Sequence, residues 1–178
     1  MTIYYDFDID DKESLFDFDY ERIASLIIKK TLMEEHFPYE VEVSISFVDD
    51  DAIRLINKEY RDIDKSTDVL SFPMIDFDDE FSLNKDRTEE SYAFIGEKVD
   101  YLDPDKEEVI LGDIVICVPK VYSQAKEYNH SVLREYAFLI THSMLHLLGF
   151  DHIKEEERKI MEDKQSKILE SLDITRDL

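Results

Sequence analysis

The sequence predicts an α+β fold in which a single domain spans residues 1–178. Segments with strand periodicity and segments with helical periodicity follow one another in a mixed order, which is typical of a sheet packed with helices around one core. No internal repeat and no linker divides the chain, and 178 residues suffice for a substantial core. Residues 132–148 are apolar nearly all round, which predicts a buried helix at the centre of the domain.

Four segments predict strands. Residues 3–9 alternate apolar and acidic side chains, as an edge strand does, and residues 41–47 alternate with a clean period of two. Residues 67–73 predict a third strand that ends at its proline. Residues 109–118 are almost continuously apolar, which indicates a strand buried on both faces, with Cys117 as an inert core residue.

Five helices are predicted between and after these strands, most of them begun by a residue that favours a helix N-terminus. They run from 17 or 19 to 35, and over 52–60, 119–128, 132–148 and 154–172, with N-terminal signals at Asp17 or Asp19, Asp49 or Asp50, Pro119 and Ser131.

The segment 76–108 differs from the rest of the chain. It contains thirteen acidic and four basic residues, and only residues 92–96 resemble a short strand. A long segment without regular structure is uncommon inside a compact domain. We therefore expect an acidic insertion or mobile loop here, rather than part of the core.

Composition limits the partners and the location. The formal net charge of −23 taken alone argues against a nucleic-acid partner, because phosphate groups repel such a surface. The single cysteine excludes an intrachain disulfide and favours the cytoplasm. No apolar run approaches the roughly 20 residues that span a bilayer, and residues 1–8 lack the basic and apolar parts of a signal peptide. We expect a cytoplasmic protein without a membrane or disulfide partner.

Three of the five histidines lie within residues 142–152. His142 and His146 are four residues apart, so a helix places both rings on one face, one turn apart. Gly149 suits the left-handed residue at which a helix ends, and His152 can then turn back toward the other two. Three imidazoles leave the fourth position of a tetrahedral zinc ion to water, which is the arrangement of a catalytic site. The same ligands also admit nickel, cobalt or iron.

Two alternatives bear on this stretch. A core helix can carry histidines by chance, but two rings in an apolar run bring nitrogen atoms that need partners when buried. The spacing H-x-x-x-H-x-x-G-x-x-H is also that of the metzincin peptidases. Those enzymes place a glutamate base after the first histidine, where this chain has Ser143. Met161, the only methionine downstream, falls in a predicted helix rather than in a tight turn.

A zinc-bound water has a pKa of about 7, so a metal site supplies hydroxide without a carboxylate base. A phosphodiester substrate needs in addition a cation that binds phosphate and stabilises the negative charge of the transition state. Arg61 is the candidate, since a guanidinium meets two phosphate oxygens at once. The alternative role for Arg61 is a surface ion pair with Asp62 or Asp64, and the sequence leaves both open.

Three motifs resemble one known family. The string H-S-M-L-H-L-L-G-F-D-H at 142–152 resembles the signature H-G-x-L-H-L-x-G-Y-D-H of the YbeY endoribonucleases, also called rRNA maturation factors. Tyr60-Arg61 with residues 67–73 resembles a second motif of that family, and residues 111–116 with Gln124-Ala125 resemble a third. The motifs occur in family order and cover most of the chain from about 41 to 172, but neither the first 20 residues nor the acidic segment.

The resemblance implies a zinc-dependent endoribonuclease, specific for single-stranded RNA, that acts in ribosomal RNA maturation and ribosome quality control. Ribosomal RNA and the ribosome or its small-subunit proteins are the implied partners. His142, His146 and His152 are the implied zinc ligands, and Arg61 is the implied catalytic arginine. The implied fold is a mixed sheet of about four strands packed with about five helices, with the metal-binding helix at its centre.

The chain departs from the family signature at two positions. Ser143 replaces the usual glycine and Phe150 the usual tyrosine, and neither position is a ligand. Metal binding should therefore be retained. The alternative functions are a metzincin-like zinc peptidase and a non-catalytic ribosome assembly factor that uses the metal for stability.

Overall fold

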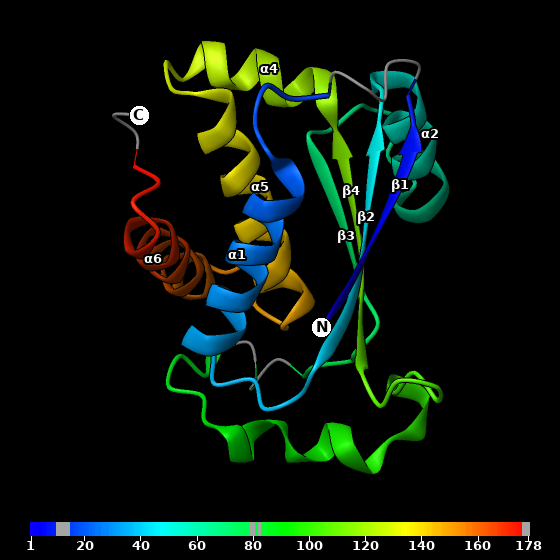
Figure 1. Cartoon of the computed structure of the whole chain (residues 1–178), viewed down its shortest axis with the longest axis vertical. Helices are drawn as coiled ribbons and strands as arrows, with labels where there is room; N and C mark the ends of the chain where they lie inside the picture. Colours follow the sequence, from blue (N-terminus) through cyan, green and yellow to red (C-terminus); the bar gives the residue numbers. More distant parts are fainter. Residues whose placement is uncertain (10–14, 79–80, 82, 176–178) are drawn as a thin grey trace.

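The computed structural model describes residues 1–9, 15–78, 81 and 83–175. These residues contain a four-stranded sheet with the strand order β1-β2-β4-β3. β1 and β2 are parallel, as are β2 and β4, whereas β3 runs antiparallel to β4 (Figure 1). The sheet is thus mixed, as expected, and its strands are β1 (Thr2–Asp8), β2 (Val41–Val48), β3 (Val69–Pro73) and β4 (Val109–Cys117).

Helices cover the two faces of the sheet unequally. On one face lie α1 (Tyr20–Glu34), α5 (Val132–Leu147) and α6 (Glu155–Ser171), while α2 (Asp50–Arg61) packs on the other (Figure 1). The helix α4 (Val118–Glu127) follows directly from β4 and leads into α5. All five predicted helices are therefore present, within a few residues of their expected bounds.

Side-chain caps explain where three of these helices begin. Asp19, Asp49 and Ser131 each accept a hydrogen bond from the backbone N–H three residues further on, at 3.0, 2.8 and 3.1 Å. Each such bond satisfies a donor that the first turn of a helix otherwise leaves without a partner. These contacts confirm Asp19 and Asp49, out of the paired alternatives, and Ser131 as the N-terminal signals.

The helix α5 is the centre of the domain, as its apolar sequence predicted. It contacts α1, α4 and α6 as well as β3 and β4. Tyr136, Ile140 and Met144 are fully buried along it in the main core, and the ring of Tyr136 stacks on that of Phe47 of β2. A helix packed against three helices and two strands has little freedom to shift, which favours a fixed position for the side chains at its C-terminal end.

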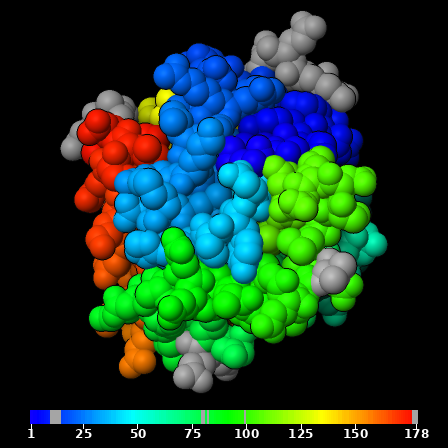
Figure 2. All heavy atoms as spheres, turned by 60° about the horizontal axis from the view of Figure 1, so that its bottom comes forward, coloured from blue at the N-terminus to red at the C-terminus, as the bar shows by residue number. Residues whose placement is uncertain are grey.

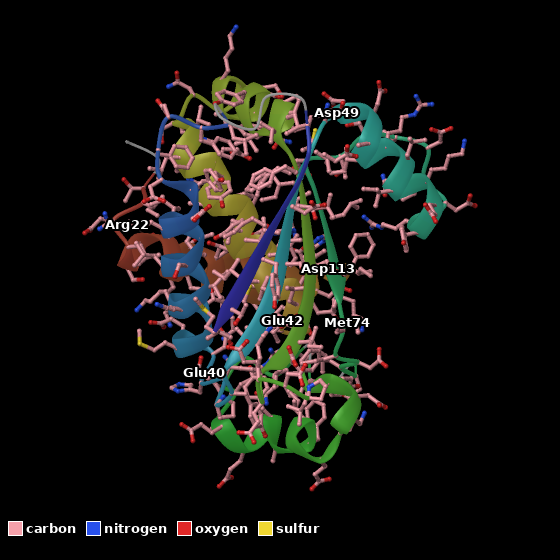
Figure 3. The ribbon with its side chains drawn as sticks, turned by 45° about the vertical axis from the view of Figure 1, so that its right-hand side comes forward. Arg22, Glu40, Glu42, Asp49, Met74 and Asp113 are labelled. Atoms are coloured by element: carbon pink, nitrogen blue, oxygen red, sulfur yellow. The ribbon has the colours of Figure 1, made fainter. Side chains whose placement is uncertain are left out.

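The opposite face of the sheet is only partly covered. A small apolar cluster lies under α2 and includes Ile53, Leu70 and Cys117, which confirms Cys117 as a core residue. Beyond α2, Glu42 and Asp113 lie on the open part of the sheet (Figure 3). No helix within the described ranges is both long enough and apolar enough to cross a bilayer.

The structure corrects two expectations for the acidic segment. Residues 92–96 form part of a 3-10 helix, η1 (Glu89–Glu97), followed by η2 (Val99–Tyr101), and not a strand. Tyr92 and Ile95 are fully buried in the main core, so the segment does not lie outside it. The ring of Tyr92 packs edge-on against that of Phe37 at 4.9 Å between centroids. Figure 2 shows the segment extending across one end of the molecule, beside the residues that join α1 to β2.

Candidate metal centre

The C-terminal end of α5 and the turn after it bring the three histidines together. His142 and His146 lie on adjacent turns of α5, and the helix ends at a left-handed Gly149 with φ +81°. The Gly149 N–H donates to the carbonyl of His146 at 2.9 Å, and the Phe150 N–H donates to that of Leu145 at 3.0 Å. This pair of bonds is a helix-ending motif that reverses the chain, as the position of the glycine predicted.

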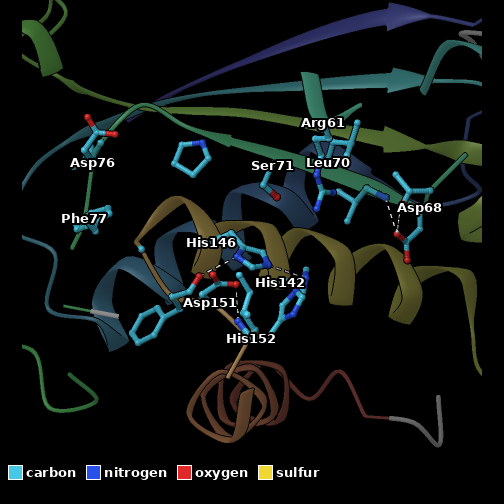
Figure 4. Close-up of a pocket in the computed structure, with 17 residues that line it drawn as sticks. Arg61, Asp68, Leu70, Ser71, Asp76, Phe77, His142, His146, Asp151 and His152 are labelled. Atoms are coloured by element: carbon cyan, nitrogen blue, oxygen red, sulfur yellow. Dashed lines mark hydrogen bonds between the residues drawn. The ribbon is translucent and has the colours of Figure 1, made fainter. Parts of the chain in front are cut away.

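The three rings face a common point (Figure 4). The Nε2 atoms of His142 and His146 are 3.1 Å apart, and one ring nitrogen from each of the three histidines lies within 4.8 Å of the other two. The ring of His152 is 5.4 Å from that of His142 and 4.9 Å from that of His146, measured between centroids. The spacing of the three histidines in the sequence therefore correctly predicted that their rings lie together in space.

The protonation of His146 is set by the turn. Its Nδ1 lies 2.9 Å from the carbonyl oxygen of Phe150, and a carbonyl can only accept, so Nδ1 carries the proton. Nε2 is then the unprotonated nitrogen, whose lone pair faces Nε2 of His142 and would bind a metal, as in many sites where a backbone carbonyl orients the ligand. Burial, with His142 as the next cause, lowers the pKa of His146 to about 4, so the ring is neutral at physiological pH.

The arrangement fits a divalent transition metal. Burial and the neighbouring His152 also lower the pKa of His142, so this ring is neutral as well. Two neutral rings with ring nitrogens 3.1 Å apart and a third ring beside them form a nitrogen donor set that suits zinc and its neighbours. His152 is exposed, which leaves the cluster accessible from solvent.

The histidines line one side of a cleft of about 750 Å³, and residues of β3 line the other. Arg61, the last residue of α2, reaches into the same cleft (Figure 4). The ion pair proposed as its alternative role is not formed within the described part of the chain. Asp64 instead binds Arg54 at 2.6 Å and Lys58 at 2.9 Å, which together lower its pKa to about 2.

Comparison with known proteins identifies the family of this chain. The model of the family described as endoribonuclease YbeY matches residues 6–173. The chain belongs to the endoribonuclease YbeY family. Endoribonuclease YbeY of Agathobacter rectalis is 49% identical over 166 residues, which cover 92% of this chain and 94% of that protein. The protein of the same name from Lachnospira eligens is 44% identical over 178 residues, which cover 99% of this chain and 100% of that protein.

A solved structure resembles the fold of this YbeY-family chain. A Thermotoga maritima protein determined in solution has 20% sequence identity and a TM-score of 0.50, with coverage of 96% of this chain and 91% of that one. At this identity the likeness concerns the fold alone. It agrees with the single α+β domain found here.

Sequence reasoning did not single out three residues of this YbeY-family cleft: Asp68, Ser71 and Asp151. Asp68 accepts a hydrogen bond from Gln124 at 3.1 Å and so joins the start of β3 to α4. Asp68 and Gln124 lie within stretches that resemble YbeY motifs. This resemblance was the feature of the sequence that could have identified them. Asp151 lies between Gly149 and His152, and its Oδ1 accepts from the backbone N–H of His152 at 2.7 Å.

The features of a peptidase are not found at this centre. Ser143 is fully buried in α5 and does not line the cleft, so its hydroxyl cannot replace the glutamate base of the metzincins. Met161 is buried within α6, and not in a turn beneath the histidines. The YbeY-family chain shares the ligand spacing of those enzymes, but Ser143 and Met161 supply neither the glutamate base nor the methionine turn.

Proposed function

We propose that this protein is a zinc-dependent endoribonuclease that cuts single-stranded RNA. Endoribonuclease activity follows from membership of the YbeY family. One observation supports the proposal most strongly: three converging histidines line one open cleft together with an arginine that has no ion-pair partner among the described residues. We further propose ribosomal RNA as the substrate, the ribosome or its small-subunit proteins as partners, and the cytoplasm as the location.

In this proposal His142, His146 and His152 hold the metal ion. A divalent ion so held lowers the pKa of bound water to about 7 and polarises a phosphoryl oxygen. The carbonyl of Phe150 keeps the proton of His146 on Nδ1, which leaves Nε2 as the ligand atom. Arg61 binds non-bridging oxygens of the phosphate that is cut and stabilises the charge that develops there.

The charge of the protein is compatible with an RNA substrate at this cleft. The acidic residues are concentrated in residues 1–21 and 76–108, which contain 21 of the 44 acidic residues. The cleft is lined by Arg61 and by the carboxylates of Asp68, Asp76 and Asp151, and a bound divalent metal would bring the formal charge of this set from −2 to zero. Single-stranded RNA suits an open cleft, since its phosphates and bases can bend to reach the metal.

The central test measures cleavage of one RNA as a single strand and as a perfect duplex by zinc-loaded protein. We expect the single strand to be cut and the duplex to resist. His146→Ala should reduce cleavage to the background of the buffer, because it removes one of the three ligand nitrogens. Equal cleavage by the wild type and His146→Ala would show a contaminating nuclease and contradict the proposal.

The role of Arg61 needs its own comparison. Arg61→Ala should lower kcat/KM by about 10²–10³ if the guanidinium stabilises the transition state. Arg61→Lys should recover part of this loss, because it keeps the charge but not the two-pronged contact. Arg158→Ala is the matched control, since Arg158 is an exposed arginine on α6 that pairs with Glu155 and does not line the cleft.

Two outcomes would redirect the proposal. Anomalous scattering at metal absorption edges identifies the bound ion, and nickel, cobalt or iron would replace zinc in the account. Protein that binds metal, melts at a lower temperature when chelated and cuts no RNA would instead be a non-catalytic assembly factor.

A further inference from the structure

Arg87 is a buried cation in the acidic segment, only 3% exposed. Its guanidinium lies between two aromatic rings, 4.2 Å from the centroid of Phe81 and 3.4 Å from that of Phe150. Its nitrogens donate to three backbone carbonyls: Nε to Asn84 at 3.1 Å, Nη2 to Phe81 at 3.0 Å and Nη1 to Leu148 at 2.6 Å. A guanidinium held by both its faces and its edge has a single position.

These contacts join two regions far apart in the sequence. Asn84 and Phe81 belong to the acidic segment, whereas Leu148 is the C-terminal cap residue of α5. The last carbonyls of a helix lack partners within the helix and carry partial negative charge, so a cation there is favourable. Arg87 thus fastens the acidic segment to the end of the helix that carries His142 and His146.

The turn that Arg87 holds, residues 148–150, also orients His146, one of the proposed metal ligands. Phe150 presents its ring to Arg87 and its carbonyl oxygen to Nδ1 of His146. Phe77 of the same segment also lies at this turn: a Cβ added to Gly149 would overlap its ring, so the ring packs directly on the backbone of Gly149. The acidic segment therefore contacts the turn 148–150 through two residues, Arg87 and Phe77.

We infer that Arg87 is a positioning residue for the metal centre. By holding Leu148 and Phe150, it keeps the Phe150 carbonyl where it fixes the proton of His146 on Nδ1 and leaves Nε2 free for the metal. The inference rests on the metal site of the proposed function. It gives the acidic segment, which no sequence motif covers, a role at the site.

Cobalt(II) binding tests the inference, because its absorption spectrum reports both affinity and ligand geometry. Arg87→Met keeps much of the apolar stem but removes every donor, and we expect cobalt affinity to fall by about 10–100-fold, as for other residues that orient metal ligands. Phe150→Leu keeps the carbonyl but removes the ring beneath the guanidinium, and it should weaken binding less. Arg87→Lys should recover only part of the affinity.

Ile95→Ala is the matched control. Ile95 is fully buried in the same segment and does not line the cleft, so this variant loosens the segment without touching the turn. Its cobalt affinity, measured well below its melting temperature, should stay within about twofold of the wild type, since buried apolar contacts away from a site affect it only indirectly. A merely structural role for Arg87 would give Arg87→Met the same small change, and that result would overturn the inference.

A second measurement reads the histidine directly. Imidazole ¹⁵N chemical shifts in metal-free protein should show His146 with its proton on Nδ1 in the wild type and in Ile95→Ala, and a mixture of tautomers in Arg87→Met and Phe150→Leu. An unchanged tautomer in both variants would overturn the inference. Failure of the wild type itself to bind cobalt would instead overturn the metal site, so the two failures are distinguishable.

Discussion

The metal turn (residues 146–152) and the acidic segment (residues 76–108) lie against each other, yet only the first could be predicted from sequence. In the turn, a helix and its glycine fix the relative positions of residues a few places apart, so spacing alone carries the geometry. In the acidic segment, position depends on partners such as Phe37 and Leu148, which are about 50 to 60 residues away. Local rules predict the first kind of structure and not the second.

Charge was a misleading guide to the acidic segment. Its acidic residues indicated a solvated loop, but the same stretch contains Phe77, Phe81, Tyr92 and Phe94. Truly disordered segments are poor in aromatic residues because they cannot bury enough apolar surface. In the structure these rings pack on one another, with centroids of Phe77 and Phe81 4.6 Å apart. The aromatic content was the signal that could have placed the segment against the core.

The largest expected effect tests whether the acidic segment truly belongs to the core. Ile95→Ala removes a fully buried side chain of the main cluster. We expect the free energy of unfolding to fall by about 2–5 kcal/mol, the usual cost of deleting a large aliphatic group from a packed interior. Denaturant titration followed by circular dichroism measures it.

Leu83→Ala is the control for this substitution, because Leu83 lies in the same segment but is 38% exposed. It should change stability by about 0.5 kcal/mol or less, as exposed positions generally do. Equal, small losses from both variants would mean that the segment lies outside the core after all, and the contrast between the two regions would then disappear.

An intermediate effect tests the contact between the two regions. Gly149→Ala adds a Cβ to a residue whose φ is +81°, and this Cβ would lie against the ring of Phe77. Backbone strain of this kind costs about 1–3 kcal/mol, and the steric overlap adds to it. The melting temperature should therefore fall. Gly96→Ala is the matched control, since the nearest atom to its new Cβ is the hydroxyl of Tyr39, at the end of a side chain that can move.

A double-mutant cycle sharpens the same point. Phe77→Ala removes the ring that the new Cβ would meet, so Gly149→Ala should cost less in that background than in the wild type. The difference isolates the contact between the acidic segment and the turn from the backbone strain, which remains in both backgrounds. Additive losses would show that the ring and the turn are not in contact in solution.

The same distinction between local and distant contacts explains how much of the rest was predictable. The sequence predicted Ser131 as a helix cap, and Asp19 and Asp49 each as one of two candidates, because a cap acts on a backbone group three residues away. The pairing of Asp68 with Gln124, across 56 residues, had no local signal beyond the motifs that contain them. Similarly, the sequence offered Arg61 as a candidate cation, but only the fold places it in the cleft with the histidines.

The smallest expected effect concerns α5, the helix that carries His142 and His146. Ser143 is fully buried, and its hydroxyl has no hydrogen-bond partner among the residues that the structure describes. A buried hydroxyl without a partner is destabilising, and alanine has the higher helix propensity. We expect Ser143→Ala to raise the free energy of unfolding by about 1 kcal/mol. Cobalt affinity should not change, since the side chain does not line the cleft.

Thr141 provides the comparison for Ser143. Its hydroxyl is buried in the same helix but donates to the carbonyl of Ala137 at 2.8 Å, so Thr141→Val removes a satisfied hydrogen bond and should lower stability by about 1 kcal/mol. Opposite signs for the two variants, measured by chemical denaturation, would show that hydrogen bonding rather than polarity decides the cost. A loss of stability in Ser143→Ala would mean that its hydroxyl is bonded in solution. The serine at position 143 would then stabilise α5 through a hydrogen bond that its spacing and burial do not predict.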